Sequence, residues 1–368
     1  MSDPNNLPKR TTPHYALYQR EIFIGGTEGR LPFFSTDPTA LEEKAKEHLS
    51  LGGRLYAESN AGTSLTHRAD REAFYRELPV AKVAAELNLP YCLSTAGSQP
   101  IEDVAKANGS GPRFYQLYMP HDDELTLSLL NRAWKSGFDV CIVTLDTWQL
   151  AWRHDDVRTA NYAFYFGLGA DIGLTDPVFR RRLKEAGVDP AKDPQKVGQL
   201  WIDNVWHGKA HTWQKMAWAM KEWKHISGGR PFLLKGIQCI EDALKAREYR
   251  VDGIVVSNHA GRQVDGAVGS LDVLEEIVQA VPELVVLYDS GIRGASDVFK
   301  AIALGAKAVL VGRLWVWGLS IQGEFGIRHV MKSLLAEFDI LMNVAGYPSI
   351  KDVDRSALRV IPYGSSKF

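Results

Sequence analysis

A chain of 368 residues has room for one large α/β domain or two ordinary ones. Its 45% hydrophobic and 24% charged residues are typical of a soluble globular protein, and a formal net charge of -1 gives no basic field for nucleic acid. No apolar run reaches the roughly 18 residues of a membrane-spanning helix, so a membrane partner is not expected.

The three cysteines, Cys92, Cys141 and Cys239, lie far apart in apolar runs and lack metal-ligand spacing. We expect reduced core residues, no metal, and an intracellular protein. Residues 1–20 are polar and lack the apolar core of a signal peptide, so the expected location is the cytoplasm. The alternative is the peroxisome, because the final Ser366-Lys367-Phe368 resembles the Ser-Lys-Leu signal except in its last residue.

Residues 1–78 are predicted to form an N-terminal helical cap region. From about residue 90, short apolar, β-branched runs alternate with helical patterns. The predicted strands are residues 91–95, 113–119, 139–146, 231–236, 253–258, 285–290 and 308–313. The predicted helices include residues 79–89, 124–135, 240–248, 271–280 and 295–304. Apolar strands separated by helices predict a parallel sheet that is buried on both faces.

Polar and reactive residues stand at the ends of these strands rather than in their middles. They are Gln116, Tyr118, Thr144, Asp146, Lys235, Ser257, His259, Asp289 and Arg313. In a closed parallel barrel, the carboxyl ends of all strands meet at one face, where the active site is built. The sequence therefore predicts an α/β fold of the TIM (β/α)8 type over residues 79–368. Such a barrel has about eight strands, but only seven are recognisable, and strand 1 is missing between roughly Phe74 and Pro79.

The connection from Asp146 to Lys235 is far longer than the usual loop of about 2–6 residues and is rich in aromatic residues. It is predicted to be an insertion at residues 147–230. We expect residues 212–225 to form the outer helix between two strands. Parts of residues 148–206 are expected to form a lid over the barrel mouth or a subunit contact.

A phosphate site is predicted where Asp289-Ser290-Gly291-Ile292-Arg293-Gly294 follows a strand and opens a helix, with Gly312-Arg313 ending the next strand. Helix N-termini attract phosphate through free N–H groups and the helix dipole. The glycines allow close approach of the backbone, and Arg293 and Arg313 add charge-assisted hydrogen bonds. A late position in the barrel matches the common phosphate site of this fold.

His259 ends a predicted strand in a glycine-bearing turn, three residues before Arg262. A lone histidine is usually structural, but Asp146 at another strand end could align this one as a base. Arg262 and Arg153 could hold a substrate carboxylate between them. Lys235 has two interpretations, a Schiff-base nucleophile or a fixed positive charge beside an anionic cofactor. A nucleotide dehydrogenase barrel would place a catalytic cysteine in a barrel-end loop, and none of the three cysteines stands there.

Together these motifs resemble the FMN-dependent family that oxidises 2-hydroxy acids, over about residues 18–359. The matching stretches are residues 114–118, 143–153, 234–236, 253–266 and 289–318. Within the family the chain is most similar to the lactate 2-monooxygenase group, through residues 19–26, 61–63, 144–148 and the insertion that follows.

The resemblance implies FMN as cofactor, a short, lactate-like L-2-hydroxy acid as substrate, and dioxygen as final electron acceptor. It implies that His259 is the base with Asp146 in support, and that Ala96 belongs to a lactate-type pocket. The implied substrate-binding residues are Tyr56, Tyr118, Arg153 and Arg262. The implied FMN-binding residues are Ser94, Gln116, Thr144, Lys235, Ser257, Asp289, Ser290, Gly291, Arg293, Gly312 and Arg313. Lys235 is expected at the flavin N1–O2 edge, and a homo-oligomer, a tetramer or larger, is expected as well.

The chain departs from the family pattern in three places, of which Ser290 in Asp289-Ser290-Gly291 stays within the lactate-type pattern. Ala260 replaces a glycine beside His259, and its Cβ would strain the turn if that position needs a positive φ. The segment that carries strand 1 is absent. Three explanations remain for this absence. Either an exon was omitted from the sequence, or the chain is a true paralogue with impaired or no catalysis that acts at most as an assembly partner. In the third, another segment such as residues 22–34 replaces the strand. The sequence selects neither one 2-hydroxy acid nor a keto acid over a decarboxylated product.

Overall fold

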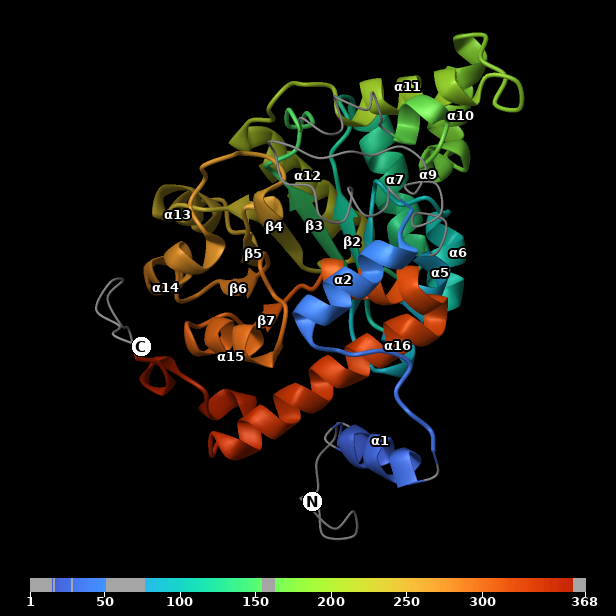
Figure 1. Cartoon of the computed structure of the whole chain (residues 1–368). Helices are drawn as coiled ribbons and strands as arrows, with labels where there is room; N and C mark the ends of the chain where they lie inside the picture. Colours follow the sequence, from blue (N-terminus) through green and yellow to red (C-terminus); the bar gives the residue numbers. More distant parts are fainter. Residues whose placement is uncertain (1–14, 16, 28, 51–76, 154–162, 360–368) are drawn as a thin grey trace.

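The computed structural model describes residues 15, 17–27, 29–50, 77–153 and 163–359. Within these ranges seven parallel strands form one sheet, in which each strand pairs with the next in chain order (Figure 1). The strands are β1 (Tyr91–Ser94), β2 (Arg113–Leu117), β3 (Val140–Thr144), β4 (Phe232–Ile237), β5 (Gly253–Val256), β6 (Val285–Tyr288) and β7 (Ala308–Val309). All seven lie where the alternating pattern predicts them, so the predicted strands are confirmed.

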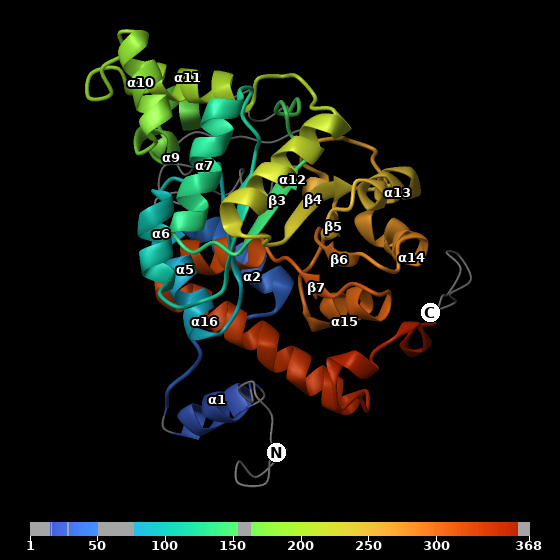
Figure 2. The same cartoon turned by 180° about the vertical axis from the view of Figure 1, so that it is seen from behind.

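Helices connect successive strands and pack on the outside of the sheet, as two opposite views show (Figures 1 and 2). They are α6 (Ile101–Asn108), α7 (Asp123–Lys135), α12 (Trp213–Ser227), α13 (Ile240–Glu248), α14 (Ser270–Ala280) and α15 (Ala295–Ala303), and α16 (Arg313–Val344) follows the last strand. The carboxylate of Asp122 caps α7, and the hydroxyl of Thr212 caps α12. Helix α12 is the predicted outer helix of the long connection, whereas α6 was not predicted.

The two faces of the sheet are buried in different ways, because strand side chains alternate between faces. Outward-facing residues such as Tyr115, Val143 and Leu234 are fully buried in the main cluster beneath the helices. A second, separate cluster forms on the inner face of the curled sheet. It consists of Ile142, Leu233, Val255 and Leu287, with Cys92, Phe114, Val140 and Leu310 packed against it.

Strands β1 and β7 are the two edges of the sheet, and among the described residues no strand pairs with the outer side of either one. The helix layer spans this opening instead, because α5 (Glu77–Glu86), which precedes β1, packs against α16. Lys82 Nζ lies 2.9 Å from Glu324 Oε1, and Arg328 Nη2 lies 2.8 Å from Glu86 Oε2. The described sheet is thus a curled, open barrel with a gap between β7 and β1 where an eighth strand would pair. This agrees with the seven strands counted in the sequence.

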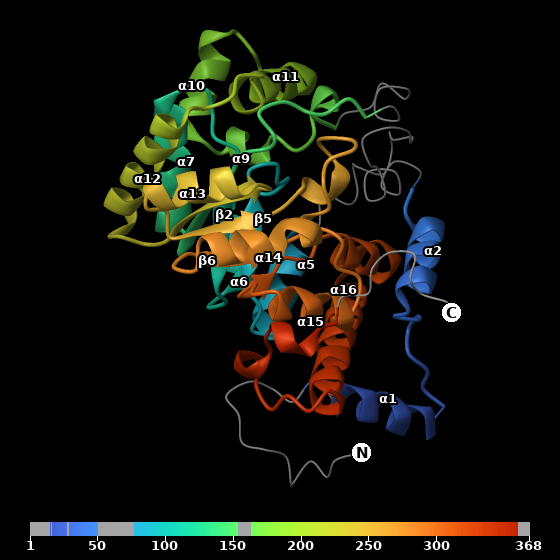
Figure 3. The same ribbon diagram turned by 90° about the vertical axis from the view of Figure 1, so that its left-hand side faces the viewer.

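The N-terminal part of the described chain lies along α16 (Figure 3). It contains α1 (Leu17–Thr27) and α2 (Pro38–His48), and α2 begins with the Asp37 carboxylate capping the Ala40 N–H group. Leu41 and Ala45 of α2 bury their side chains in a small cluster with Leu314 and Trp317 of α16.

The long insertion folds into short helices beyond one end of the sheet. These are the 3-10 helix η3 (Ala163–Phe166), α9 (Asp171–Leu174), α10 (Pro177–Glu185) and α11 (Pro194–Val205). An ion pair of 2.6 Å between Arg182 and Asp122 ties α10 to the start of α7. Three further 3-10 helices are η4 (His259–Gly261), η5 (Ile350–Asp352) and η6 (Arg355–Ala357). In the ranges given above, no helix is both long and apolar enough to cross a membrane.

Candidate active site

A layer of polar side chains lies at the carboxyl ends of the strands, directly beyond the apolar inner cluster. Residues two positions apart on a strand share a face, so each inward apolar residue is followed by an inward-facing site residue. The pairs are Cys92 and Ser94, Phe114 and Gln116, Ile142 and Thr144, Leu233 and Lys235, Val255 and Ser257, and Leu287 and Asp289. The sheet therefore brings six of the sequence-predicted FMN-binding residues into one layer.

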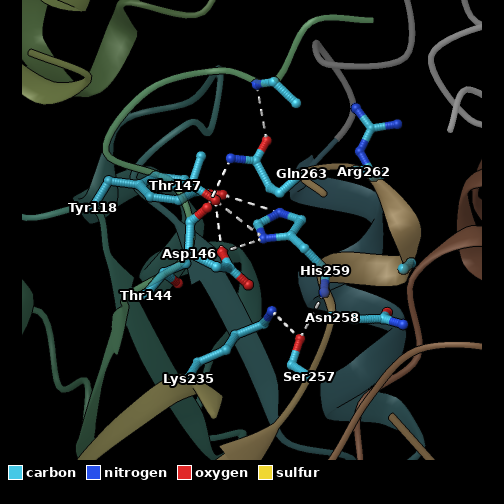
Figure 4. Close-up of polar contacts among 12 residues, drawn as sticks. Tyr118, Thr144, Asp146, Thr147, Lys235, Ser257, Asn258, His259, Arg262 and Gln263 are labelled. Atoms are coloured by element: carbon cyan, nitrogen blue, oxygen red, sulfur yellow. Dashed lines mark hydrogen bonds and ion pairs between the residues drawn. The ribbon is translucent and has the colours of Figure 1, made fainter. Parts of the chain in front are cut away.

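The imidazole of His259 forms the centre of a tight polar group at this end (Figure 4). Its Nδ1 lies 2.7 Å from Asp146 Oδ1 and 3.2 Å from Thr147 Oγ1, and the Thr147 hydroxyl donates to the same carboxylate oxygen at 2.7 Å. An ionised carboxylate only accepts hydrogen bonds, so Nδ1 carries the proton and Nε2 keeps its lone pair. Tyr118 lies on that second side, with its hydroxyl 3.5 Å from Nε2.

The electrostatics of this pair favour a charged carboxylate beside a neutral imidazole. Burial acts to raise the pKa of Asp146, but the neighbouring His259 and Lys235 outweigh it and lower that pKa to about 2. Burial and the positive charge of Lys235 lower the pKa of His259, and Asp146 opposes them only in part. His259 is therefore a neutral acceptor at ordinary pH, the state that a general base requires.

A bulge in β4 makes room for the Asp146 carboxylate. The pairing of β4 with β5 shifts between Lys235 and Ile237, and the intervening Gly236 has a φ of +104°. A Cβ at Gly236 would lie 3.1 Å from Asp146 Oδ2 and be strained by the backbone conformation. Asp146 Oδ2 is itself buried and has no hydrogen-bond partner among the described residues.

Lys235 is held as a cation at the floor of the site. Its Nζ donates to Ser257 Oγ at 2.7 Å and lies 3.0 Å from Asp289 Oδ2. Burial acts to lower the pKa of Lys235, but the charges of Asp289 and Asp146 raise it overall. A Schiff-base nucleophile must be a neutral amine, so this environment favours the fixed positive charge of the two interpretations.

Side-chain hydrogen bonds link the ends of the strands β1, β2 and β3. Ser94 Oγ donates to Gln116 Oε1 at 2.8 Å, and Gln116 Nε2 donates to Thr144 Oγ1 at 2.8 Å. Gln116 and Thr144 are buried. These bonds fix the amide of Gln116 in one orientation, so the three predicted flavin contacts form a rigid unit.

The turn that carries His259 contains two non-glycine residues in the left-handed region, and Gly261 follows them there. His259 has a φ of 54° and Ala260 a φ of 55°, so the condition under which the Ala260 Cβ strains the turn is met. Each such residue costs on the order of 1–2 kcal/mol. The Ala260 N–H donates to Ser290 Oγ at 2.9 Å, and the Ser290 hydroxyl donates to Asp289 at 2.8 Å. Ser290, at φ 84°, thereby connects the turn that carries His259 to the loop after β6.

The two predicted carboxylate-binding arginines lie in adjacent loops. Arg153 is buried, and its Nε donates to the backbone oxygen of Arg262 at 3.1 Å. In Figure 4 the Arg262 side chain points away from Asp146. The structure shows a further polar residue that was not predicted from the sequence, Gln263, which lies in the same loop as Arg262 and contacts the loop of Arg153. Its only sequence signal is its place beside Arg262. Tyr56 lies outside the described residues.

The predicted phosphate residues lie at the ends of β6 and β7. A Cβ at Gly291 or at Gly312 would meet nothing within 4 Å, so the backbone is open at both positions. Arg293 stacks over Trp317 at 5.0 Å, and Arg313 opens α16. The expectation of free N–H groups at the start of α15 is wrong for three residues. The Arg293 and Gly294 amides donate to Asp297, and the Ala295 amide donates to Glu337.

Comparison with known proteins shows which family the chain belongs to. A sequence model described as FMN-dependent dehydrogenase matches residues 75–360. An FMN-dependent alpha-hydroxy acid dehydrogenase of Penicillium citrinum is 40% identical over 396 positions, covering 95% of this chain and 97% of that protein. An L-lactate oxidase of Lysinibacillus sphaericus is 37% identical over 75% of this chain and 68% of that protein. A crystal structure of mandelate oxidase with benzoyl-formic acid superposes with a TM-score of 0.70 and 27% identity, covering 86% of this chain and 96% of the other.

The extent of these matches bears on the missing strand. The alignment with the Penicillium protein has 396 positions against 368 residues in this chain, so that relative has residues that this chain lacks. The family match begins at residue 75, where the sequence analysis placed the gap, and covers all seven strands and the whole polar layer. The chain belongs to the FMN-dependent dehydrogenase family, and its cofactor is FMN.

Proposed function

We propose that the protein oxidises a short, lactate-like L-2-hydroxy acid, with His259 as the base, the flavin as the hydride acceptor and dioxygen as the final electron acceptor. The relatives named L-lactate oxidase and mandelate oxidase support this class of substrate and of acceptor. The single observation that carries the proposal is the 2.7 Å contact between His259 Nδ1 and Asp146 Oδ1, which leaves Nε2 as a proton acceptor.

His259 Nε2 takes the proton that the alcohol loses as it becomes a carbonyl. Asp146 keeps the acceptor lone pair on Nε2 and stabilises the imidazolium that forms. Thr147 fixes the rotation of the carboxylate by donating to the same oxygen that faces the ring. Tyr118, whose hydroxyl faces Nε2, is in position to bond the substrate hydroxyl or carboxylate. Bound FMN supplies the hydride acceptor.

Arg153 and Arg262 are the proposed carboxylate-binding residues, with Tyr56 as a further contact. A guanidinium binds a carboxylate through two parallel hydrogen bonds and stays charged at every relevant pH. Burial of Arg153 lowers the local dielectric and strengthens such a bond. This arrangement places the acid group of the substrate on the loops that follow β3 and β5.

The residues present suit FMN. Ser94, Gln116, Thr144 and Ser257 offer hydroxyl and amide groups in one layer for the flavin ring, and Lys235 offers a fixed positive charge for its electron-rich edge. Asp289 and Ser290 suit the ribityl hydroxyls. The phosphate is assigned to the side chains of Arg293 and Arg313 and to the open backbone at Gly291 and Gly312, because the α15 amides are already engaged.

A catalytically impaired relative is the second candidate, favoured by one observation. Among the described residues, nothing pairs with the outer edges of β1 and β7, where an eighth strand would complete the barrel. In that case the protein would act at most as an assembly partner of an intact relative.

A homo-oligomer is part of the main proposal. Large apolar side chains are exposed on the N-terminal arm and on α16, namely Phe23, Leu31, Phe33 and Phe325.

An assay of the purified, FMN-saturated protein under air separates these functions. The proposal predicts turnover of L-lactate and other short L-2-hydroxy acids but not of their D-enantiomers, with release of a keto acid and peroxide or of the decarboxylated acid. No turnover of any L-2-hydroxy acid by protein that retains FMN would favour the non-catalytic relative.

A further inference from the structure

Gln263 makes an unusual number of contacts for a residue that does not touch the reacting group. Its Nε2 donates to the backbone oxygens of Asp146 at 2.8 Å and of Gln149 at 2.9 Å. Its Oε1 accepts from the Ala151 amide at 3.4 Å and from Arg153 Nη2 at 3.3 Å. A primary amide has two N–H donors and two acceptor lone pairs, so this side chain uses all of its hydrogen-bonding capacity on one loop (Figure 4).

That loop, residues 145–153, carries both parts of the proposed machinery from β3. Asp146 at its start aligns His259, and Arg153 at its end is a proposed carboxylate ligand. The loop has no helix or strand of its own. Its path between the two residues is therefore set by the contacts of its backbone groups, and three of those contacts go to the Gln263 amide.

The other side of the contact belongs to the base turn. Gln263 follows Arg262 directly, and Arg262 in turn accepts from Arg153 Nε through its backbone oxygen. One side chain thus connects the loop after β3 with the turn after β5. The Arg153–Arg262 bond and the Asp146–His259 contact join the same two segments.

We propose that Gln263 is a positioning residue that fixes the loop 145–153, so that Asp146 and Arg153 act on the same substrate molecule. The inference rests on the proposed function for its catalytic consequence. Its structural consequence, a loop held by one amide, is independent of turnover. Misplacement of a bound group by about 1 Å can cost on the order of 100-fold in rate.

Two variants test the inference. Gln263→Met keeps the length of the side chain and removes all four hydrogen bonds. Gln263→Glu keeps the acceptor oxygen but loses both donors and adds a negative charge beside Arg153, which competes with the substrate carboxylate. Gln279→Met is the matched control, since Gln279 is exposed on α14 and contacts only Glu275 among the hydrogen bonds seen for it.

Two readouts are needed on the FMN-saturated protein. The first is backbone hydrogen exchange over residues 145–153, which we expect to become about tenfold faster or more in Gln263→Met and to stay unchanged in the control. The second is the ratio of kcat/KM for L-lactate over L-lactamide, which lacks the carboxylate. We expect this ratio to fall about tenfold in Gln263→Met, because a displaced Arg153 no longer selects the acid, and to fall further in Gln263→Glu.

The outcomes are distinct. Faster exchange with a reduced acid-to-amide ratio supports the proposal. Unchanged exchange overturns it, and so does faster exchange with an unchanged ratio, because Gln263 would then be only structural. Absence of turnover in the wild-type protein refutes the proposed function, whereas the exchange measurement still decides whether Gln263 holds the loop.

Discussion

Replacement of Asp146 by asparagine tests the electrostatic core of the site. The carboxylate lies 2.7 Å from His259 Nδ1, and its pKa falls from 3.8 to about 2 in the folded protein. A shift of this size corresponds to about 2 kcal/mol of interaction that favours the charged carboxylate. Because the folded pKa is depressed, this stabilisation is present above pH 3.8 and is lost as the pH falls toward 2.

The same carboxylate stabilises the imidazolium that forms when His259 accepts a proton, through the 2.7 Å contact with Nδ1. A hydrogen bond to a charged group contributes about 1.5–3 kcal/mol, and loss of about 2 kcal/mol from that state slows the step by about 30-fold. An asparagine amide can also donate to Nδ1, which would move the proton to Nε2 and remove the acceptor altogether. We therefore expect Asp146→Asn to slow flavin reduction by at least about 30-fold, with FMN content unchanged.

The assay is anaerobic rapid mixing of the FMN-bound variant with saturating L-lactate, followed by the loss of visible flavin absorption. Asp139→Asn is the control, because Asp139 precedes the same strand at the opposite end of the barrel and its side chain is about half exposed. A reduction rate within threefold of the wild type, in a variant that retains FMN, would refute the role assigned to Asp146.

The remaining predictions concern the base and the backbone that holds it. His259→Gln should abolish flavin reduction and leave FMN bound. In the wild-type protein, the rate of flavin reduction should fall at acid pH only below the usual histidine pKa of 6.5, because burial lowers the pKa of His259. A rate that already falls with acidification above pH 6.5 would contradict the assignment of His259 as the base. Gly236→Ala should destabilise the fold by roughly 1–3 kcal/mol, because a Cβ would stand 3.1 Å from Asp146 Oδ2 at a φ of +104°, and an unchanged midpoint of urea unfolding would exclude this strain. Ala260→Gly should raise the free energy of unfolding by up to about 1 kcal/mol, because the strain of a left-handed alanine is relieved. The greater entropy of glycine in the unfolded chain offsets part of this gain. A loss of stability would mean that the turn is not strained.

Most of the fold and of the polar layer could be predicted from the sequence, for a simple physical reason. Strand side chains repeat every second residue, so a run such as Leu233-Leu234-Lys235 predicts both a buried strand and an inward lysine at its end. The count of seven strands followed from the same periodicity. The replacement of glycine by Ala260 raised the question of a positive φ at this position, and only the structure answered it.

What the sequence could not supply depends on irregular backbone and on distant contacts. Gln263 binds a loop more than a hundred residues earlier in the chain, and no periodicity links the two. The engagement of the Ala295 amide by Glu337 joins residues on different helices and was equally invisible. The bulge at Gly236 also escaped prediction, because its cause is the space that the Asp146 carboxylate needs.

We expect this chain, whose described residues form a sheet of seven strands, to hold FMN and to reduce it with a 2-hydroxy acid. The most direct test is the visible spectrum of the purified protein, recorded without oxygen before and after addition of L-lactate. We expect one FMN per chain and full loss of the oxidised flavin bands within the mixing time of a manual experiment. Flavin bands that persist unchanged after addition of L-lactate and other short L-2-hydroxy acids, or a protein that purifies without flavin and does not take up added FMN, would contradict it.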